Sequence, residues 1–201
     1  MAYDRRIHHR RSIRLQDYDY SHEGAYFVTI CTQGKALLFG DVEGETMRPN
    51  DVGEMIQLVW DALPQHYPGV DVDACQLMPN HLHGVIVLYA GGGAPGEAGD
   101  ATGPTDRLGR VEDPSCPIAL AEVIKRFKSF TAMRYREGVR SRGWRRLSGG
   151  LWQRNYYEHI VRHEDELNRV RRYILENPIR WQYDRENPNG WEPTITEAWE
   201  M

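Results

Sequence analysis

The stretch MPNHLHGVIVLY, residues 78–89, carries two histidines at the head of a continuous apolar run. The proline and asparagine before the first histidine favour a turn, and the β-branched residues after the second predict a strand over 81–89. Because side chains alternate along a strand, His81 and His83 project from one face and Leu82 from the other. The residues beyond them are apolar on both faces, which predicts that this strand lies inside the sheet.

Other segments predict an alternation of strands and helices. Further strands are predicted at AYFVTICT (25–32), VDVDACQLM (70–78) and LWQRNYYEHIV (151–161), with a hairpin over 37–50 and helices over 52–66, 118–137 and 163–178. The order strand, helix, strand, strand, helix, strand, followed by an extra helix, predicts an α+β fold. It corresponds to a ferredoxin-like split βαβ with an antiparallel sheet of four to five strands flanked by helices.

The helical segments have predicted ends and buried faces. The helix over 52–66 is expected to be capped by Asp51 and to bury Met55, Leu58, Val59 and Leu63. The helix over 118–137 is expected to bury Leu120, Ile124, Phe127 and Thr131. The last helix opens with three acids, which suit the positive N-terminal end of a helix dipole, and a proline ends it.

Length and composition predict one domain with extensions. A chain of 201 residues can bury a core without disulfides or metal staples. The domain is assigned to 20–183, with a basic N-terminal arm over 1–19 and a C-terminal tail over 184–201. Residues 90–117 are rich in glycine, proline and acids, so they cannot offset chain entropy and are expected to form a flexible loop insertion.

The cysteines and the apolar runs predict the compartment. Cys31, Cys75 and Cys116 lie far apart without CxxC spacing, which predicts a reducing cytoplasm and argues against a structural zinc knuckle. No apolar run approaches the roughly eighteen residues of a membrane span. The basic N-terminal residues have no apolar stretch behind them, so no secretory signal is expected.

The net charge of −4 conceals a segregation of charge along the chain. Residues 41–73 carry eight acids against Arg48, whereas residues 125–146 carry nine bases against Glu137. A concentrated basic surface can bind phosphates on an acidic protein, because binding depends on the local field. The same charges could also form a solvated helix face, and charge alone does not separate the two interpretations.

The histidine pair also has more than one interpretation. Two imidazoles on one strand face can ligate one divalent ion, although an arbitrary H-x-H pair is more often made of ordinary surface or edge histidines. The predicted central position favours ligands, because buried polar groups need partners. A histidine-triad nucleotide hydrolase would need a third histidine where the chain has Val85. Two-histidine phosphoesterases need two separated H-x-[ST] motifs, and neither is present at 81–83.

Three motifs taken together carry a family resemblance. They are YFVTICTQGKALLFG (26–40), MPNHLHG (78–84) and LWQRNYYEHIVRHEDELNRVRRYILENPIRW (151–181). In this order they resemble the tyrosine transposases associated with repetitive extragenic palindromes, which are relatives of the single-tyrosine HUH transposases of bacterial insertion sequences. The resemblance covers roughly residues 20–182. It implies the HUH endonuclease variant of the ferredoxin-like fold.

The resemblance implies roles for individual residues. His81 and His83 match the metal ligands of the HUH motif, and Tyr173 in RRYILENP matches the nucleophile. Asn177 is four residues further along the predicted helix, and so a neighbour of Tyr173 on its surface. It occupies the place of a third oxygen ligand for Mg²⁺ or Mn²⁺.

Two further tyrosines compete for the role of nucleophile. Tyr156 and Tyr157 belong to the third motif and point to opposite sides of the predicted strand over 151–161. A structural role is expected for both.

The implied reaction is cleavage and rejoining of single-stranded DNA next to a hairpin through a 5′-phosphotyrosine. A phenol with a pKa of about 10 is a better leaving group than an alkyl alcohol, so the link can be reversed. The candidate DNA-binding residues lie in the basic segment: Arg126, Lys128, Arg134, Arg142, Arg145 and Arg146. A monomer is favoured over a homodimer. The alternative function is a domesticated protein of the same fold that binds hairpin or single-stranded DNA without cutting it.

Overall fold

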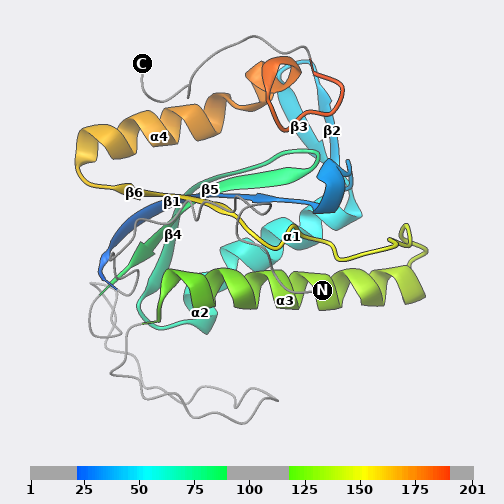
Figure 1. The fold of residues 1–201 in the computed structure, drawn as a ribbon, viewed down its shortest axis with the longest axis horizontal. Coiled ribbons are helices and arrows are strands. Elements are labelled where there is room, and N and C mark those ends of the chain that lie inside the picture. Colours follow the sequence, from blue (N-terminus) through cyan, green and yellow to red (C-terminus); the bar gives the residue numbers. More distant parts are fainter. Residues whose placement is uncertain (1–21, 90–117, 191–201) are drawn as a thin grey trace, which may run out of the picture.

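The computed structural model of the chain describes residues 22–89 and 118–190 (Figure 1). Its strands are β1 (Gly24–Cys31), β2 (Gly40–Glu43), β3 (Thr46–Pro49), β4 (Val70–Leu77), β5 (His81–Leu88) and β6 (Tyr157–Val161). Its helices are α1 (Asp51–Asp61), α2 (Leu63–His66), α3 (Leu120–Ser141) and α4 (Glu164–Glu176), with short 3₁₀ helices η1 (Gln33–Lys35) and η2 (Pro178–Tyr183).

The main sheet has four antiparallel strands in the order β4-β5-β1-β6. In sequence order these strands are the second, third, first and fourth of the sheet, which is the ferredoxin-like arrangement predicted above. β5, which carries the histidines, pairs with β1 on one side and β4 on the other, so its predicted central position is confirmed. Strands β2 and β3 form a separate hairpin.

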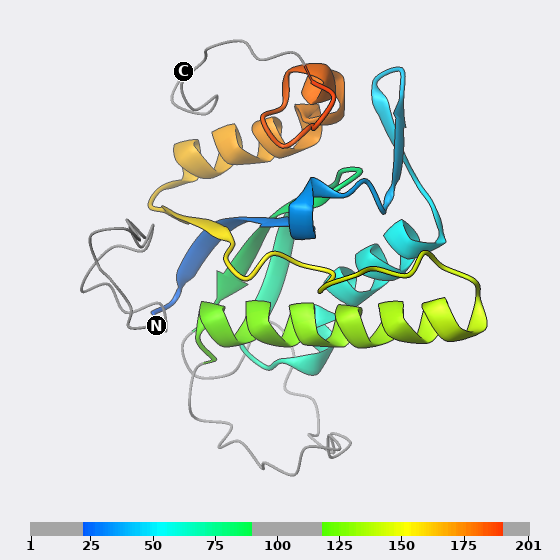
Figure 2. The same cartoon turned by 45° about the vertical axis from the view of Figure 1, so that its right-hand side comes forward.

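Helices cover both faces of this sheet (Figures 1 and 2). Helices α1, α2 and α3 lie on one face and α4 lies on the other. The larger core fills the space beneath α1 and α3 and includes Tyr26, Trp60, Ile86 and Phe127. A smaller cluster lies under α4 and contains Phe27, Val85, Val161, Val170 and Ile174. Alternation along β5 therefore gives its even-numbered residues to the large core and its histidines to the α4 face.

The helix predicted over 52–66 differs from the observed one at both ends and in its buried face. Asn50, not Asp51, caps it, because its Oδ1 accepts hydrogen bonds from the backbone N–H groups of Val52 and Gly53 at 3.0 and 3.1 Å. α1 ends at Asp61, and α2 is a separate short helix with a proline in its first turn.

The buried stripe of α1 is offset from the predicted one. Val52, Gly53, Ile56 and Trp60 are buried, whereas Leu58 is 70% exposed. Trp60 decides the face, since its indole packs on β5. Leu63 is buried as predicted, and the stripe predicted for α3, with Leu120, Ile124, Phe127 and Thr131, is confirmed.

Parts of the predicted organisation lie outside the described residues. These are the N-terminal arm over 1–19, the loop over 90–117, Cys116 and the end of the tail after residue 190. Cys31 and Cys75 are free cysteines. Within the ranges 22–89 and 118–190, no helix combines the length and apolar character needed to cross a membrane.

Gly84 in the histidine strand is required by the packing of Trp60. A Cβ at Gly84 would lie 2.3 Å from Trp60 Cζ2, and the indole is fully buried. Gly84→Ala is therefore expected to lower the free energy of unfolding by about 2–3 kcal/mol through overpacking, as measured by urea denaturation. Gly149→Ala is the matched control, since a Cβ there meets nothing within 4 Å. Equal stability of the two variants would contradict this packing.

Candidate active site

The Nε2 atoms of the two histidines of β5 face each other. His81 is 0% and His83 3% exposed, and their Nε2 atoms lie 3.0 Å apart. The rings meet edge to face, with centroids separated by 4.5 Å. Two nitrogens at this spacing match two ligands placed about 2.1 Å from one ion at a right angle.

The hydrogen bonds around Asn80 set the tautomer of His81. The Asn80 Nδ2 group donates to the carbonyl oxygens of Lys35 at 3.1 Å and Glu186 at 2.7 Å, which identifies Oδ1 as the acceptor of this amide. This Oδ1 lies 2.9 Å from His81 Nδ1, so Nδ1 carries the proton. The lone pair of His81 is therefore on Nε2, on the side of His83, as a ligating histidine requires.

Burial keeps both imidazoles neutral. His83 Nδ1 lies 2.9 Å from Thr29 Oγ1, a hydroxyl that can donate or accept. Desolvation, reinforced by the positive charges of Lys35 and Arg185, lowers the pKa of His81 to about 3. Desolvation also lowers the pKa of His83 well below its ordinary value. Neutral imidazole is the form that ligates a metal ion.

Asp184 brings a carboxylate to the same point. Its Oδ2 lies 3.5 Å from His81 Nε2, and the ligating atoms of His81, His83 and Asp184 all lie within 4.8 Å of one another. The sequence assigned Asp184 to the tail and so missed it. The residue follows η2, which reverses the chain after α4, and no local pattern indicates where such a reversal leads.

Asn177, the predicted third ligand, ends α4. It is 3% exposed, and its Oδ1 is buried without a hydrogen-bond partner among the described residues. Among residues 22–89 and 118–190, the Oδ2 of Asp184 is likewise buried without a hydrogen-bond partner. Buried oxygens that lack donors cost free energy. The two imidazole nitrogens and the Asp184 carboxylate, which lie within reach of one another, form a donor set compatible with a divalent metal ion.

Tyr173 lies beside this group of ligands. Its ring centroid is 5.3 Å from that of His83 and 5.9 Å from that of Phe27. Burial, and then the negative charge of Asp184, raise the pKa of Tyr173 to about 12, while the Asn177 side chain acts in the opposite direction. The structure thus brings the predicted nucleophile next to the predicted histidine ligands, with its phenol protonated at neutral pH.

The two competing tyrosines lie on opposite faces of the sheet, as predicted. Tyr157 pairs with Thr29 and lies on the α4 face, edge-on to Phe27 at 6.1 Å. Tyr156 belongs to the larger core on the other face, with Lys128 Nζ 5.2 Å from its ring centroid.

The candidate DNA-binding residues of α3 lie on the face opposite the histidines (Figure 1). Lys128 Nζ donates to the carbonyl oxygens of Gln153, Arg154 and Asn155 at 3.0, 3.4 and 3.0 Å, and burial lowers its pKa to about 8. It therefore holds the segment that enters β6.

Arg126 is also engaged within the protein. Its Nε lies 2.9 Å from Glu122 Oε1, and its guanidinium carbon lies 5.2 Å from the centre of the Tyr67 ring.

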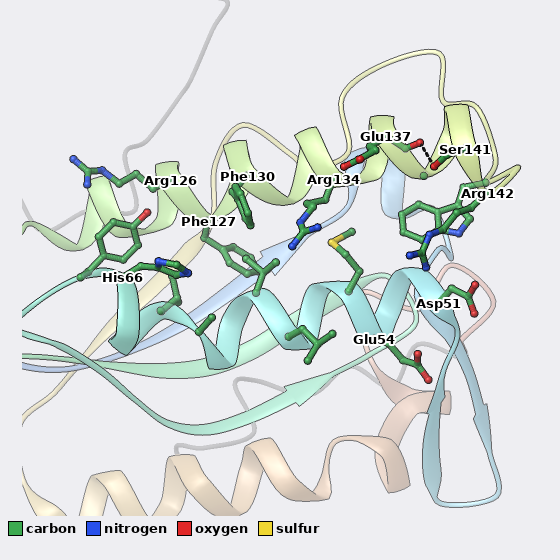
Figure 3. A pocket seen from close by; sticks show the side chains of 18 residues that line it. Asp51, Glu54, His66, Arg126, Phe127, Phe130, Arg134, Glu137, Ser141 and Arg142 are labelled. Carbon is green, nitrogen blue, oxygen red and sulfur yellow. Dashed lines mark hydrogen bonds between the residues drawn. The ribbon is translucent and has the colours of Figure 1, made fainter. Parts of the chain in front are cut away.

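The other candidate cations are more accessible. A groove of about 1000 Å³ lies between α1 and α3. Figure 3 shows Arg134 pointing into this groove, whereas Arg126 lies at its end. The charged residues that line it are Arg126, Arg134, Arg142, Asp51, Glu54 and Glu137, so the groove is nearly balanced in charge. Arg142, Arg145 and Arg146 follow one another closely at the end of α3 and are exposed. This end of α3 is the more cationic surface.

Comparisons with known proteins agree with this architecture. No family model matches the chain. An uncharacterized protein of Haemophilus influenzae is 37% identical over 187 residues, which cover 91% of this chain and 96% of that protein. A second protein of that organism, described as a "Putative REP-associated tyrosine transposase", is 24% identical over 165 residues, covering 82% of this chain and 76% of the other.

The fold is shared with a solved structure of a REP-associated tyrosine transposase bound to a REP hairpin. The TM-score is 0.51 at 15% sequence identity, with 84% of this chain and 73% of that chain covered. The chain is thus a relative of the uncharacterized Haemophilus influenzae protein, and it is similar in sequence to one REP-associated tyrosine transposase and in fold to another, a family named after repetitive extragenic palindromes.

Proposed function

We propose that this chain is a metal-dependent endonuclease and transposase that cleaves and rejoins single-stranded DNA next to hairpins through a 5′-phosphotyrosine. One observation carries the proposal. The Nε2 atoms of His81 and His83 and the carboxylate of Asp184 converge within 4.8 Å, and the ring of Tyr173 lies 5.3 Å from that of His83. A nucleophile beside a set of metal ligands suits phosphoryl transfer.

In this proposal His81, His83 and Asp184 hold a divalent cation, Mg²⁺ or Mn²⁺, and Asn177 offers a further oxygen. When bound, the ion supplies polarisation of a non-bridging phosphate oxygen and neutralises charge in the transition state. The hydrogen bond that His81 donates to Asn80 and the hydrogen bond between His83 and Thr29 keep the imidazoles oriented.

Tyr173 performs the covalent step. Its phenolic oxygen loses its proton and bonds to phosphorus, and the bond from phosphorus to the 3′ oxygen breaks. The downstream strand then carries the 5′-phosphotyrosine, and the upstream strand leaves with a free 3′-hydroxyl. A later attack by a 3′-hydroxyl expels the phenolate and restores the phosphodiester, so strand transfer needs no further energy source.

DNA binding is assigned to the surface that carries the six cations predicted from the sequence. The exposed Arg142, Arg145 and Arg146, with Arg134, would grip phosphates of the hairpin stem, while Arg126 and Lys128 shape the surface. Because these residues and the tyrosine lie on opposite faces of the sheet, the DNA would pass around the molecule. The chain is proposed to act as a monomer in the cytoplasm, where the free Cys31 and Cys75 stay reduced.

Incubation with hairpin-bearing single-stranded DNA tests the proposal. A covalent adduct that survives denaturation should form with Mn²⁺ or Mg²⁺ and disappear with EDTA. A fully paired duplex of the same sequence should give none. Tight binding of the hairpin without adduct under either metal would instead identify a non-cleaving hairpin-binding protein.

The buried phenol predicts the pH dependence of cleavage. With the pKa of Tyr173 at about 12, the reactive phenolate is a small fraction that grows as pH rises. The initial rate of adduct formation is therefore expected to increase about tenfold per pH unit over roughly pH 6.5–8.5. Timed denaturing gels at constant ionic strength measure it. A rate that is flat or falls across this range would contradict a protonated phenol as the nucleophile.

A further inference from the structure

Helix α4, which carries Tyr173, packs on the sheet through a small apolar contact. Within the helix only Val170 and Ile174 are buried, and the cluster beneath them is the smaller of the two cores. Leu167 and Tyr173 are partly buried against the same cluster. Because this apolar contact is small, the polar contacts at the flanks of α4 contribute to where Tyr173 lies.

The first polar contact ties the N-terminal turn of α4 to the edge strand β6. The carboxylate of Glu166 accepts a hydrogen bond from the backbone N–H of Arg162 at 2.7 Å and lies 2.8 Å from His159 Nε2. The His163 side chain caps the same turn by accepting from the backbone N–H of Glu166 at 3.2 Å. This end of the helix is thus fixed to the strand that precedes it.

The second polar contact ties the middle of α4 to the opposite edge strand, β4. Arg171 donates from Nε and Nη2 to the two carboxylate oxygens of Asp73, at 2.8 and 2.7 Å. Its Nη1 donates to Glu164 at 3.0 Å and Asn168 at 2.9 Å within the helix. A bidentate guanidinium–carboxylate pair restricts both distance and orientation.

A bulge in β4 makes this pair possible. The register changes from Val72 opposite Ile86 to Cys75 opposite Gly84, so two residues of β4 lie across from one residue of β5. These two residues both reach the α4 face. Ala74 packs in the cluster under α4, and Asp73 meets Arg171. A bulge typically redirects a side chain in this way.

We propose that Asp73 and Arg171 form a clamp that positions Tyr173 over His83 for strand cleavage. The proposal rests on the proposed function and assigns positioning roles to both residues. Arg171 is two positions before Tyr173 on α4, so a rotation of the helix that breaks the clamp also moves the phenol. Misplacement by about 1 Å can cost roughly a hundredfold in rate.

The test compares Arg171→Ala with Arg172→Ala, which removes the same charge from the exposed neighbouring position. At saturating hairpin DNA and Mn²⁺, Arg171→Ala and the near-isosteric Asp73→Asn are expected to slow adduct formation by about 10- to 100-fold. Hairpin affinity and Mn²⁺ affinity should stay within about twofold. Arg172→Ala should retain nearly the wild-type rate.

A double-mutant cycle adds a sharper criterion. In Asp73→Asn/Arg171→Ala the rate should be no lower than in the slower single variant, because both changes break one contact. The clamp would be overturned if the rate losses of the two single variants multiplied in the double variant. Equal rates of adduct formation for Arg171→Ala and Arg172→Ala would also overturn it.

Hydrogen exchange of the DNA-free protein separates the clamp from the proposed function. Backbone amides of α4 should exchange at least about fivefold faster in Arg171→Ala than in wild type or Arg172→Ala. A wild-type protein that forms no adduct would refute the proposed function, and this measurement would still decide whether the clamp holds α4. Faster exchange with an unchanged rate of adduct formation would show that the contact stabilises the helix without positioning the tyrosine.

Discussion

Tyr173→Phe is expected to abolish the covalent protein–DNA adduct, with a reduction of at least about a thousandfold in its rate of formation. The substitution removes the attacking oxygen and leaves the ring in place against Phe27 and His83. Folding and hairpin binding should therefore be retained. The measurement is a denaturing gel with the DNA labelled at one end or the other. With a 5′-phosphotyrosine, the 3′-labelled fragment should migrate with the protein, and the 5′-labelled fragment should be released.

The two other tyrosines of the motif are the matched controls. Tyr156→Phe changes a ring on the opposite face of the sheet, and Tyr157→Phe changes one that lies on the α4 face against Phe27. Both variants are expected to form the adduct. An adduct that persists in Tyr173→Phe and is lost in Tyr157→Phe would transfer the nucleophile to the strand.

His81→Ala and His83→Ala are each expected to weaken Mn²⁺ binding by about a hundredfold or more. Loss of a residue that only supports a ligand already costs roughly 10- to 100-fold, and a direct ligand should exceed that. The expected loss follows from the 3.0 Å separation of the two Nε2 atoms and the neutrality of both rings. Isothermal titration calorimetry in the absence of DNA measures it. The exposed His66→Ala is the control, and an equal loss in that variant would contradict a site on β5.

The oxygen ligand is decided by a pair of variants in the same assay. Asp184→Asn removes a negative charge while keeping the side-chain size, and Asn177→Ser replaces the amide with a shorter hydroxyl side chain. The carboxylate lies 3.5 Å from His81 Nε2, so Asp184→Asn is expected to have the larger effect on Mn²⁺ affinity, by about tenfold. A larger loss in Asn177→Ser would support Asn177 as the third ligand, as the sequence predicted.

Much of the fold follows from local patterns in the sequence. The strand bearing the histidines, its central position and the ferredoxin-like strand order were predicted and are observed. The buried face of α1 was not predicted correctly, because apolar residues lie all around this helix. The space beside Gly84, which accommodates the Trp60 indole, determines which face is buried. Asn50 displaced Asp51 as the cap for a similar reason, since neighbouring residues can both serve and the entry of the chain decides between them.

The same distinction between local sequence patterns and tertiary packing applies to the candidate site. Backbone periodicity is enough to predict that His81 and His83 share a strand face and that Tyr173 and Asn177 are neighbours on a helix. The contacts between residues far apart along the chain come from the packing of the folded domain. η2 turns the chain back so that Asp184 reaches His81, and a bulge in β4 brings Asp73 to Arg171. Packing also placed the basic helix on the face away from the tyrosine. Such contacts depend on the directions of turns and the fit between layers, which no short stretch of sequence encodes.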